Sequence, residues 1–289
     1  METLTLKQKI FNFSITKIVL ALIVCLVVIN LGQQIVGKLL GSTLLDKNFR
    51  NLIKGIVVSS LALLSYIIFF KYYEKRDVAE LAVKGIVKNL ITGTLIGFVL
   101  QALTILVVYF NGGFNVIAVN PISFILVPIT VAFTIAIIEE ILVRGVFFRI
   151  LEEKLGSYIA LIISGIIFGA LHLANPNSTL LSGLCITFAG FLLGAAFIYS
   201  RNLWFPIAIH FAWNFTQSGI FGAITSGNEK TNSLLVSKIE GSVLLTGGEF
   251  GPEGSIQATL LCLITAAFLL FLSRKQNKIV QPYWEANKA

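Results

Sequence analysis

The chain has 289 residues, of which 56% are hydrophobic and only 12% are charged. Soluble domains carry about 25% charged residues, so this composition excludes an ordinary soluble protein. The long apolar runs show no polar alternation, which excludes a transmembrane β-barrel, and helices are the remaining way to satisfy the backbone in lipid. Basic residues flanking membrane segments explain the net charge of +8 better than nucleic-acid binding does. We therefore expect an all-α, polytopic membrane protein.

Eight apolar segments are candidates for membrane spans, each of which needs about 20 residues. The first follows Lys7 and Lys9, as in a signal peptide, but it has no small-residue cleavage site and is treated as a span. We expect residues 1–289 to form a single transmembrane domain, with a long connection at residues 223–254. The predicted spans are residues 18–37, 55–70, 90–110, 122–148, 158–173, 180–200, 203–222 and 255–273.

Lysine and arginine are concentrated in the connections that would lie on the cytoplasmic side if the N-terminus is cytoplasmic. The positive-inside rule then predicts that both termini are cytoplasmic and that residues 223–254 are extracytoplasmic. Among the basic residues that support this orientation are Lys7, Lys9 and Lys288. The compact chain carries no long soluble extension, and we expect a multi-pass protein of a bacterial cell membrane.

Rare polar groups within the spans fall at a similar depth. Glu139 and Glu140 lie on the fourth predicted span, His172 on the fifth and His210 on the seventh. With a rise of about 1.5 Å per residue, they lie roughly 10 to 21 Å from the cytoplasmic side. A buried carboxylate in hydrocarbon costs on the order of 3 kcal/mol, so such groups usually have a function. We expect one shared site in a cavity inside the bundle.

The spacing assigns different surroundings to the two glutamates. Glu140 and Arg144 are four residues apart and can pair on one helix face. Glu139 points about 100° away from Glu140 and can face a cavity. The alternative is a purely structural ion-pair cluster with Arg144, although a single glutamate would suffice for that.

The two histidines each have a polar or aromatic companion one helical turn away. His210 and Asn214 share a face, and Phe168 precedes His172 and can form a wall of the cavity. Each histidine alone could be a satisfied core imidazole, and Asn214 could simply bond across helices. The common depth of the histidines and the glutamates favours a site.

Three motifs on separate spans resemble those of a known family. They are Glu-Glu-x-x-x-Arg ending at Arg144, Phe-x-x-x-His ending at His172 and His-x-x-x-Asn ending at Asn214. In this order they resemble the CAAX protease and bacteriocin-processing (CPBP, or Abi) family of intramembrane proteases, to which the type II CAAX prenyl endopeptidases belong. The resemblance covers residues 122–215, which we expect to be the catalytic core.

The resemblance implies a role for each matching residue. Glu139 would activate the attacking water with the help of His172, and a positioned carboxylate can act as a general base. A histidine and an amide donor can stabilise an oxyanion. The implied catalytic residues are Glu139, His172, His210 and Asn214, with Glu140 and Arg144 in support and Phe168 in the cavity wall.

The resemblance leaves the use of a metal open. His172, His210 and Glu139 could bind zinc with water in the fourth position, although the chain has no His-Glu-x-x-His helix. The same groups could serve a metal-free glutamate protease, which we favour slightly. Zinc is thus the one candidate cofactor.

The expected function is an intramembrane endopeptidase that hydrolyses a peptide bond of a membrane-associated or lipidated peptide or protein, bacteriocin precursors included. The alternative is a non-catalytic immunity or accessory protein that binds a peptide or bacteriocin. A proton-coupled transporter is less favoured, because the chain shows no internal repeat or broken span. Residues 223–254 could cap the cavity, select substrate or form only a surface loop.

Overall fold

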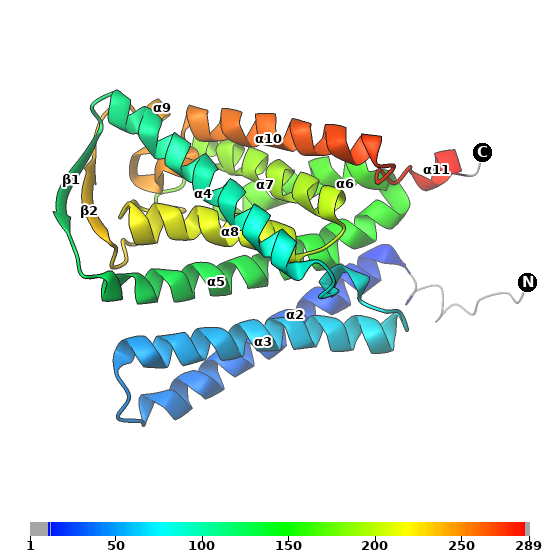
Figure 1. The fold of residues 1–289 in the computed structure, drawn as a ribbon. Helices are drawn as coiled ribbons and strands as arrows, with labels where there is room; N and C mark the ends of the chain where they lie inside the picture. Colours follow the sequence, from blue (N-terminus) through cyan, green and yellow to red (C-terminus); the bar gives the residue numbers. More distant parts are fainter. Residues whose placement is uncertain (1–10, 12, 287–289) are drawn as a thin grey trace, which may run out of the picture.

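The computed structural model describes residue 11 and residues 13–286, so Lys7, Lys9 and Lys288 lie outside the described residues. The described chain consists mainly of helices, with one two-stranded sheet (Figure 1). The helices are α2 (Ser14–Gly41), α3 (Lys47–Tyr73), α4 (Ile86–Phe110), α5 (Leu126–Glu140), α6 (Arg149–His172), α7 (Leu180–Ser200), α8 (Trp204–Phe215), α9 (Val243–Thr246), α10 (Ile256–Lys275) and α11 (Tyr283–Ala286). The strands are β1 (Phe114–Val119) and β2 (Leu235–Ile239), two π-helical stretches are Ile141–Phe148 and Thr216–Ile220, and four 3₁₀ turns are Ala79–Leu81, Ile122–Ile125, Gly248–Phe250 and Pro252–Gly254.

Six helical segments of the described chain are long and apolar enough to cross a membrane. The expected polytopic, all-α membrane protein is therefore confirmed, whereas the number of eight spans stays a prediction. The segment Ile122–His172 is one of the six, where the sequence predicted two spans, and its helical geometry is interrupted at Gly156 (φ 77°, ψ 167°). The predicted span 203–222 is represented by α8, of 12 residues, and the π-helical stretch after it.

The helices form a bundle around α7 and α8. Helix α7 packs against α6 and α10, and α8 packs against α4 and α5 (Figure 1). Helices α2 and α3 form a hairpin that packs on α5. This arrangement brings α5, α6 and α8, which carry the three sequence motifs, into one neighbourhood.

Glycines let the helices that carry the motifs approach closely. A Cβ atom at Gly97 of α4 would lie 2.3 Å from the carbonyl oxygen of Ile209, the residue before His210. A Cβ at Gly169 of α6 would lie 2.4 Å from the carbonyl oxygen of Gly183 on α7. Such backbone contact is typical of small residues at membrane helix interfaces. It fixes the distance of α8 and α6 from their neighbours.

The small sheet closes one end of the bundle. Strands β1 and β2 pair antiparallel, with Phe114 opposite Ile239 and Val119 opposite Leu235. Figure 1 shows the sheet at the opposite end of the bundle from both chain ends. The sequence analysis assigned no strand to the residues between the third and fourth spans, because the partner of β1 lies more than a hundred residues away. The pairing ties the connection after α8 to the connection before α5.

An ion-pair cluster lies where α3 ends, away from the sheet. The buried carboxylate of Glu74 accepts hydrogen bonds from Lys17, Arg76 and Arg149, each at 2.9 Å. These partners come from α2, from the connection after α3 and from α6. The cluster therefore anchors the α2–α3 hairpin to the helices that carry the motifs.

Candidate active site

A fully buried ion pair supports the candidate site from within the bundle. The Nη1 atom of Arg144 donates to Oε1 of Glu140 at 2.9 Å, and both side chains have no exposed surface. Arg144 also donates to the carbonyl oxygen of Gly190 at 3.0 Å and lies 4.5 Å from the ring centre of Phe168. The pairing predicted from the four-residue spacing is confirmed. Arg144 thus links the segment that carries the first motif to α7 and α6.

The same carboxylate oxygen also bonds the histidine of the third motif. Nδ1 of His210 lies 2.9 Å from Oε1 of Glu140. His210 is therefore oriented by Glu140, and its second nitrogen points elsewhere. That nitrogen, Nε2, lies 3.9 Å from Oε2 of Glu139.

Glu139 has different surroundings from its neighbour in sequence. Its side chain is 32% exposed, while that of Glu140 is completely buried. Glu139 is the second-last residue of α5, and the π-helical stretch Ile141–Phe148 follows directly after Glu140. Such stretches often occur at functional sites because they re-aim side chains. The Glu140 carboxylate is thus enclosed in the buried ion pair, and the Glu139 carboxylate is accessible from a pocket.

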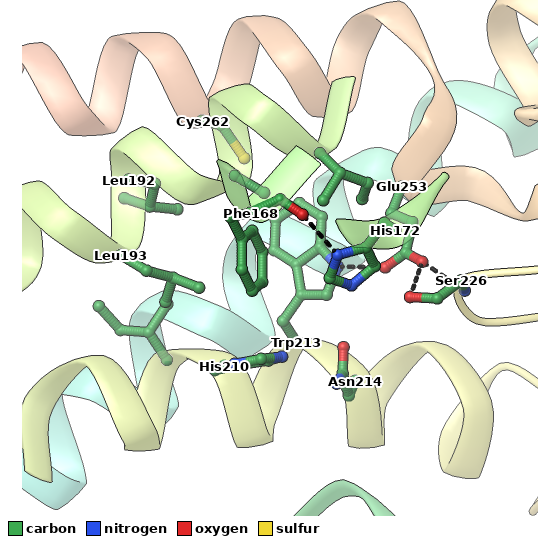
Figure 2. A pocket seen from close by; sticks show the side chains of 13 residues that line it. Phe168, His172, Leu192, Leu193, His210, Trp213, Asn214, Ser226, Glu253 and Cys262 are labelled. Atoms are coloured by element: carbon green, nitrogen blue, oxygen red, sulfur yellow. Dashed lines mark hydrogen bonds between the residues drawn. The ribbon is translucent and has the colours of Figure 1, made fainter. Parts of the chain in front are cut away.

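His172 is held by its own helix and faces the same region. Its Nδ1 atom lies 2.8 Å from the carbonyl oxygen of Phe168, one turn earlier. The Phe168 ring centre lies 4.6 Å from the His172 ring and 6.2 Å from the His210 ring. Figure 2 shows Phe168, His172 and His210 gathered around one cavity. Phe168 thus contacts both imidazoles.

A pocket of about 510 Å³ joins these groups. Its lining includes Glu139, His172, His210 and Asn214, which come from α5, α6 and α8. A smaller cavity of about 30 Å³ adjoins the same histidines and Asn214, and its other walls include Leu192, Trp213 and Cys262 (Figure 2). The structure therefore brings together all four residues to which the sequence assigned catalysis.

The connection after α8 forms one wall of the larger pocket. Residues from Ala223 to Thr231 line it, among them Thr225, Ser226, Asn228 and Glu229. This segment is tied to the turn after α6, because Asn175 donates to the carbonyl oxygen of Ser226 at 3.1 Å. The connection at residues 223–254 therefore contributes directly to the pocket.

The structure adds one acidic residue that the sequence analysis did not select, Glu253. Its side chain accepts hydrogen bonds from the backbone amide and the hydroxyl of Ser226, and from Nε1 of Trp213 at 3.3 Å. Burial raises the pKa of the Glu253 carboxyl, and the bonds from Ser226 oppose that shift. Figure 2 shows Glu253 beside His172. The only signal in the sequence was a glutamate within a glycine-rich turn.

The geometry does not assemble a metal site. Among the described residues, no group of three or more His, Cys, Asp or Glu side chains could hold a metal ion. Nδ1 of His210 is engaged by Glu140, and Nδ1 of His172 by a backbone carbonyl. These bonds leave Nε2 of each ring toward the pocket, but among the described residues Glu139, His172 and His210 are not gathered closely enough to form a zinc site.

The helices indicate an integral membrane protein, and a comparison with protein families indicates its class. Residues 121–216, about one third of the chain, match the family described as type II CAAX prenyl endopeptidase Rce1-like. The resemblance read from the three motifs is thereby confirmed, because this segment is similar to the CAAX protease family. The match indicates a CAAX-type intramembrane protease. No curated protein and no solved structure matches the chain.

Proposed function

We propose that this protein is an intramembrane endopeptidase in which Glu139 activates the water that attacks a peptide bond. One observation carries the proposal: the partly exposed Glu139 carboxylate lines a pocket of about 510 Å³ together with His172, His210 and Asn214. A general base must lie within reach of the proton that it removes. The pocket supplies space for a water and a peptide carbonyl beside that carboxylate.

The hydrogen bonds of the two imidazoles suit different tasks. His172 can donate from Nδ1 to the Phe168 carbonyl, which leaves its Nε2 as an acceptor for a proton of the attacking water. His210 bonds the Glu140 carboxylate through Nδ1, and this carboxylate would support a doubly protonated ring. The Nε2–H group of that ring would then donate toward the pocket. His172 thus assists the base, and His210 stabilises negative charge.

The proposed reaction keeps protons and bonds in balance. Water attacks the peptide carbonyl while one of its protons passes to Glu139, which gives a tetrahedral intermediate with a negatively charged oxygen. His210 and Asn214 donate hydrogen bonds to that oxygen, and such donors typically contribute about 10²- to 10³-fold in rate each. Collapse of the intermediate breaks the C–N bond, and Glu139 returns its proton to the leaving nitrogen. Glu140 and Arg144 hold the site without touching substrate.

The substrate that fits best is an extended peptide segment at the membrane. The polar wall from Thr225 to Thr231 would contact the peptide backbone, and Glu253 would hold that wall through Ser226. The matched family carries prenyl endopeptidase in its name, so a lipidated peptide or protein is the class of substrate that we propose.

We also propose that both termini lie in the cytoplasm of a bacterial cell and that residues 122–215 form the catalytic core of a single domain. The turn at Gly156 would separate two of the eight proposed spans.

Membranes from cells that carry the wild type or Glu139→Gln test the proposal. Comparative proteomics of the two should reveal a precursor that accumulates uncleaved in the variant. Glu240→Gln is the matched control, because Glu240 is exposed and pairs only with Lys238 in the described structure. If the phenotype survives Glu139→Ala and His172→Ala, the protein acts as a binding partner and not as a protease.

A further inference from the structure

A second pocket lies away from the candidate active site, toward the end of the bundle where the described chain ends. It has a volume of about 580 Å³ and is bordered by the start of α4, the end of α7 and the end of α10. Figure 1 shows the end of α10 near the C-terminus, far from the sheet. It shares no lining residue with the site pocket. We refer to it as the basic pocket.

The charge of the basic pocket is one-sided. Lys84, Lys88, Arg201 and Lys278 line it, and none of its lining residues is an aspartate or glutamate. Arg201 is already balanced, because its guanidinium lies 2.5 Å from the carboxylate of Glu152. The three lysines form no ion pair among the described residues. The pocket therefore presents three uncompensated positive charges.

Lys278 is the most confined of these lysines. Its ammonium donates to the carbonyl oxygen of Tyr199 and lies 4.9 Å from that residue's ring centre. Burial, together with the positive charges of Arg201 and Lys88, lowers the pKa of Lys278. An anion bound between these groups would remove that repulsion. Lys84 and Lys88 remain exposed at the mouth.

The backbone at the mouth also favours an anion. Helix α4 begins at Ile86 after Gly85, which adopts a left-handed conformation (φ 77°) and gives no side-chain cap. Gly85 itself lines the pocket. The uncapped N–H groups and the helix dipole at such a start favour negative charge. This helix start adds to the lysines and does not define the site alone.

The pocket has an apolar layer next to the charged one. Four apolar side chains form this layer, those of Ile96 on α4, Phe205 on α8, and Phe268 and Leu272 on α10. Phe268 is 58% exposed on the outer surface of α10. A soluble anion would use only the charged layer. A ligand with a phosphate and hydrocarbon chains would use both layers.

We propose that the basic pocket binds an anionic phospholipid, with its phosphate between Lys84, Lys88 and Lys278 and an acyl chain along Phe268. Basic pockets between transmembrane helices are suited to anionic headgroups. The volume accommodates a headgroup and glycerol, while the acyl chains continue over the exposed face of α10. This site is independent of the proposed proteolysis.

Native mass spectrometry of the full-length protein in detergent tests this site. The probes are phosphatidylglycerol and phosphatidylcholine with identical acyl chains, and inorganic phosphate as a competitor. We expect retained phosphatidylglycerol, weak phosphatidylcholine binding and no displacement by millimolar phosphate. The triple variant Lys84→Gln, Lys88→Gln, Lys278→Gln should bind phosphatidylglycerol about a hundredfold more weakly.

The matched control is the triple variant Lys71→Gln, Lys75→Gln, Lys275→Gln, which removes three basic residues that do not line the pocket. Equal weakening in both triples would overturn the proposal, since it would show a general basic surface. Equal binding of both lipids, or displacement by inorganic phosphate, would overturn it as well. If the first triple does not fold, the double variant Lys84→Gln, Lys88→Gln at the exposed mouth gives the same comparison against Lys71→Gln, Lys75→Gln.

Discussion

Replacing Arg144 by methionine tests whether the buried ion pair of Arg144 and Glu140 stabilises the fold around the candidate site. Among the described residues, Arg144 is the one arginine or lysine that bonds the Glu140 carboxylate, and both side chains are completely buried. Methionine keeps much of the volume but leaves the carboxylate with His210 as its one described partner, while the Gly190 carbonyl loses the hydrogen bond from Arg144. Removing one member of a buried pair typically costs about 3–5 kcal/mol. We expect a loss of that size in the free energy of unfolding.

The double variant Glu140→Gln, Arg144→Met separates charge from packing. It removes both charges, so it should be less destabilised than Arg144→Met alone, with a coupling on the order of 1–3 kcal/mol. Reversible unfolding in mixed detergent micelles measures these two variants and the single variant Glu140→Gln, which completes the double-mutant cycle. Arg274→Met is the matched control, because Arg274 is exposed at the end of α10. If Arg144→Met is as stable as Arg274→Met, the assignment of Arg144 as the structural partner of Glu140 is wrong.

The remaining predictions concern the pH dependence of stability through Glu74, substrate binding through Glu253, and the use of a metal. Burial alone would raise the pKa of Glu74, but the interactions with Arg149, Lys17 and Arg76 hold it below its ordinary value of 4.5. The free energy of unfolding should therefore be largest above that pH and decrease as the pH drops through the pKa of the folded protein. Glu74→Gln, measured by the same unfolding assay, should make this decrease smaller. Glu253→Gln places an amide donor against Nε1 of Trp213 and should raise KM for the precursor more than it lowers kcat, whereas Glu249→Gln, at an exposed position of the same loop, should change neither; equal effects would remove the role of Glu253. Chelators should leave cleavage intact, and a complete loss that zinc restores would contradict metal-independent chemistry.

The membrane class and the ion pair could be predicted because they depend on local sequence. The apolar composition indicates that the helices lie in a lipid bilayer. A four-residue spacing places Glu140 and Arg144 on one helix face, whatever the rest of the fold is. The gathering of α5, α6 and α8 was inferred from depth alone, and close glycine contacts such as Gly97 against Ile209 decide how near the helices come. Those contacts depend on which helices are neighbours, which the sequence pattern does not contain.

The sheet and Glu253 could not be predicted because they depend on distant partners. Strand β1 has a weak pattern of its own and is defined by pairing with β2. Glu253 lies in a turn, and its burial follows from bonds to Ser226 and Trp213, which are far from it in sequence. The sequence predicted one continuous span at residues 203–222, whereas α8 is short and continues as a π-helical stretch.

The most direct test of the account is the rate at which the purified protein, in lipid, cleaves the precursor identified by proteomics. Glu139→Gln should lower that rate by about 10²- to 10⁴-fold, the usual contribution of a general base, while folding and precursor binding persist. Glu240→Gln should cleave at the wild-type rate. A Glu139→Gln protein that cleaves as fast as the wild type would contradict the claim that this carboxylate activates the attacking water.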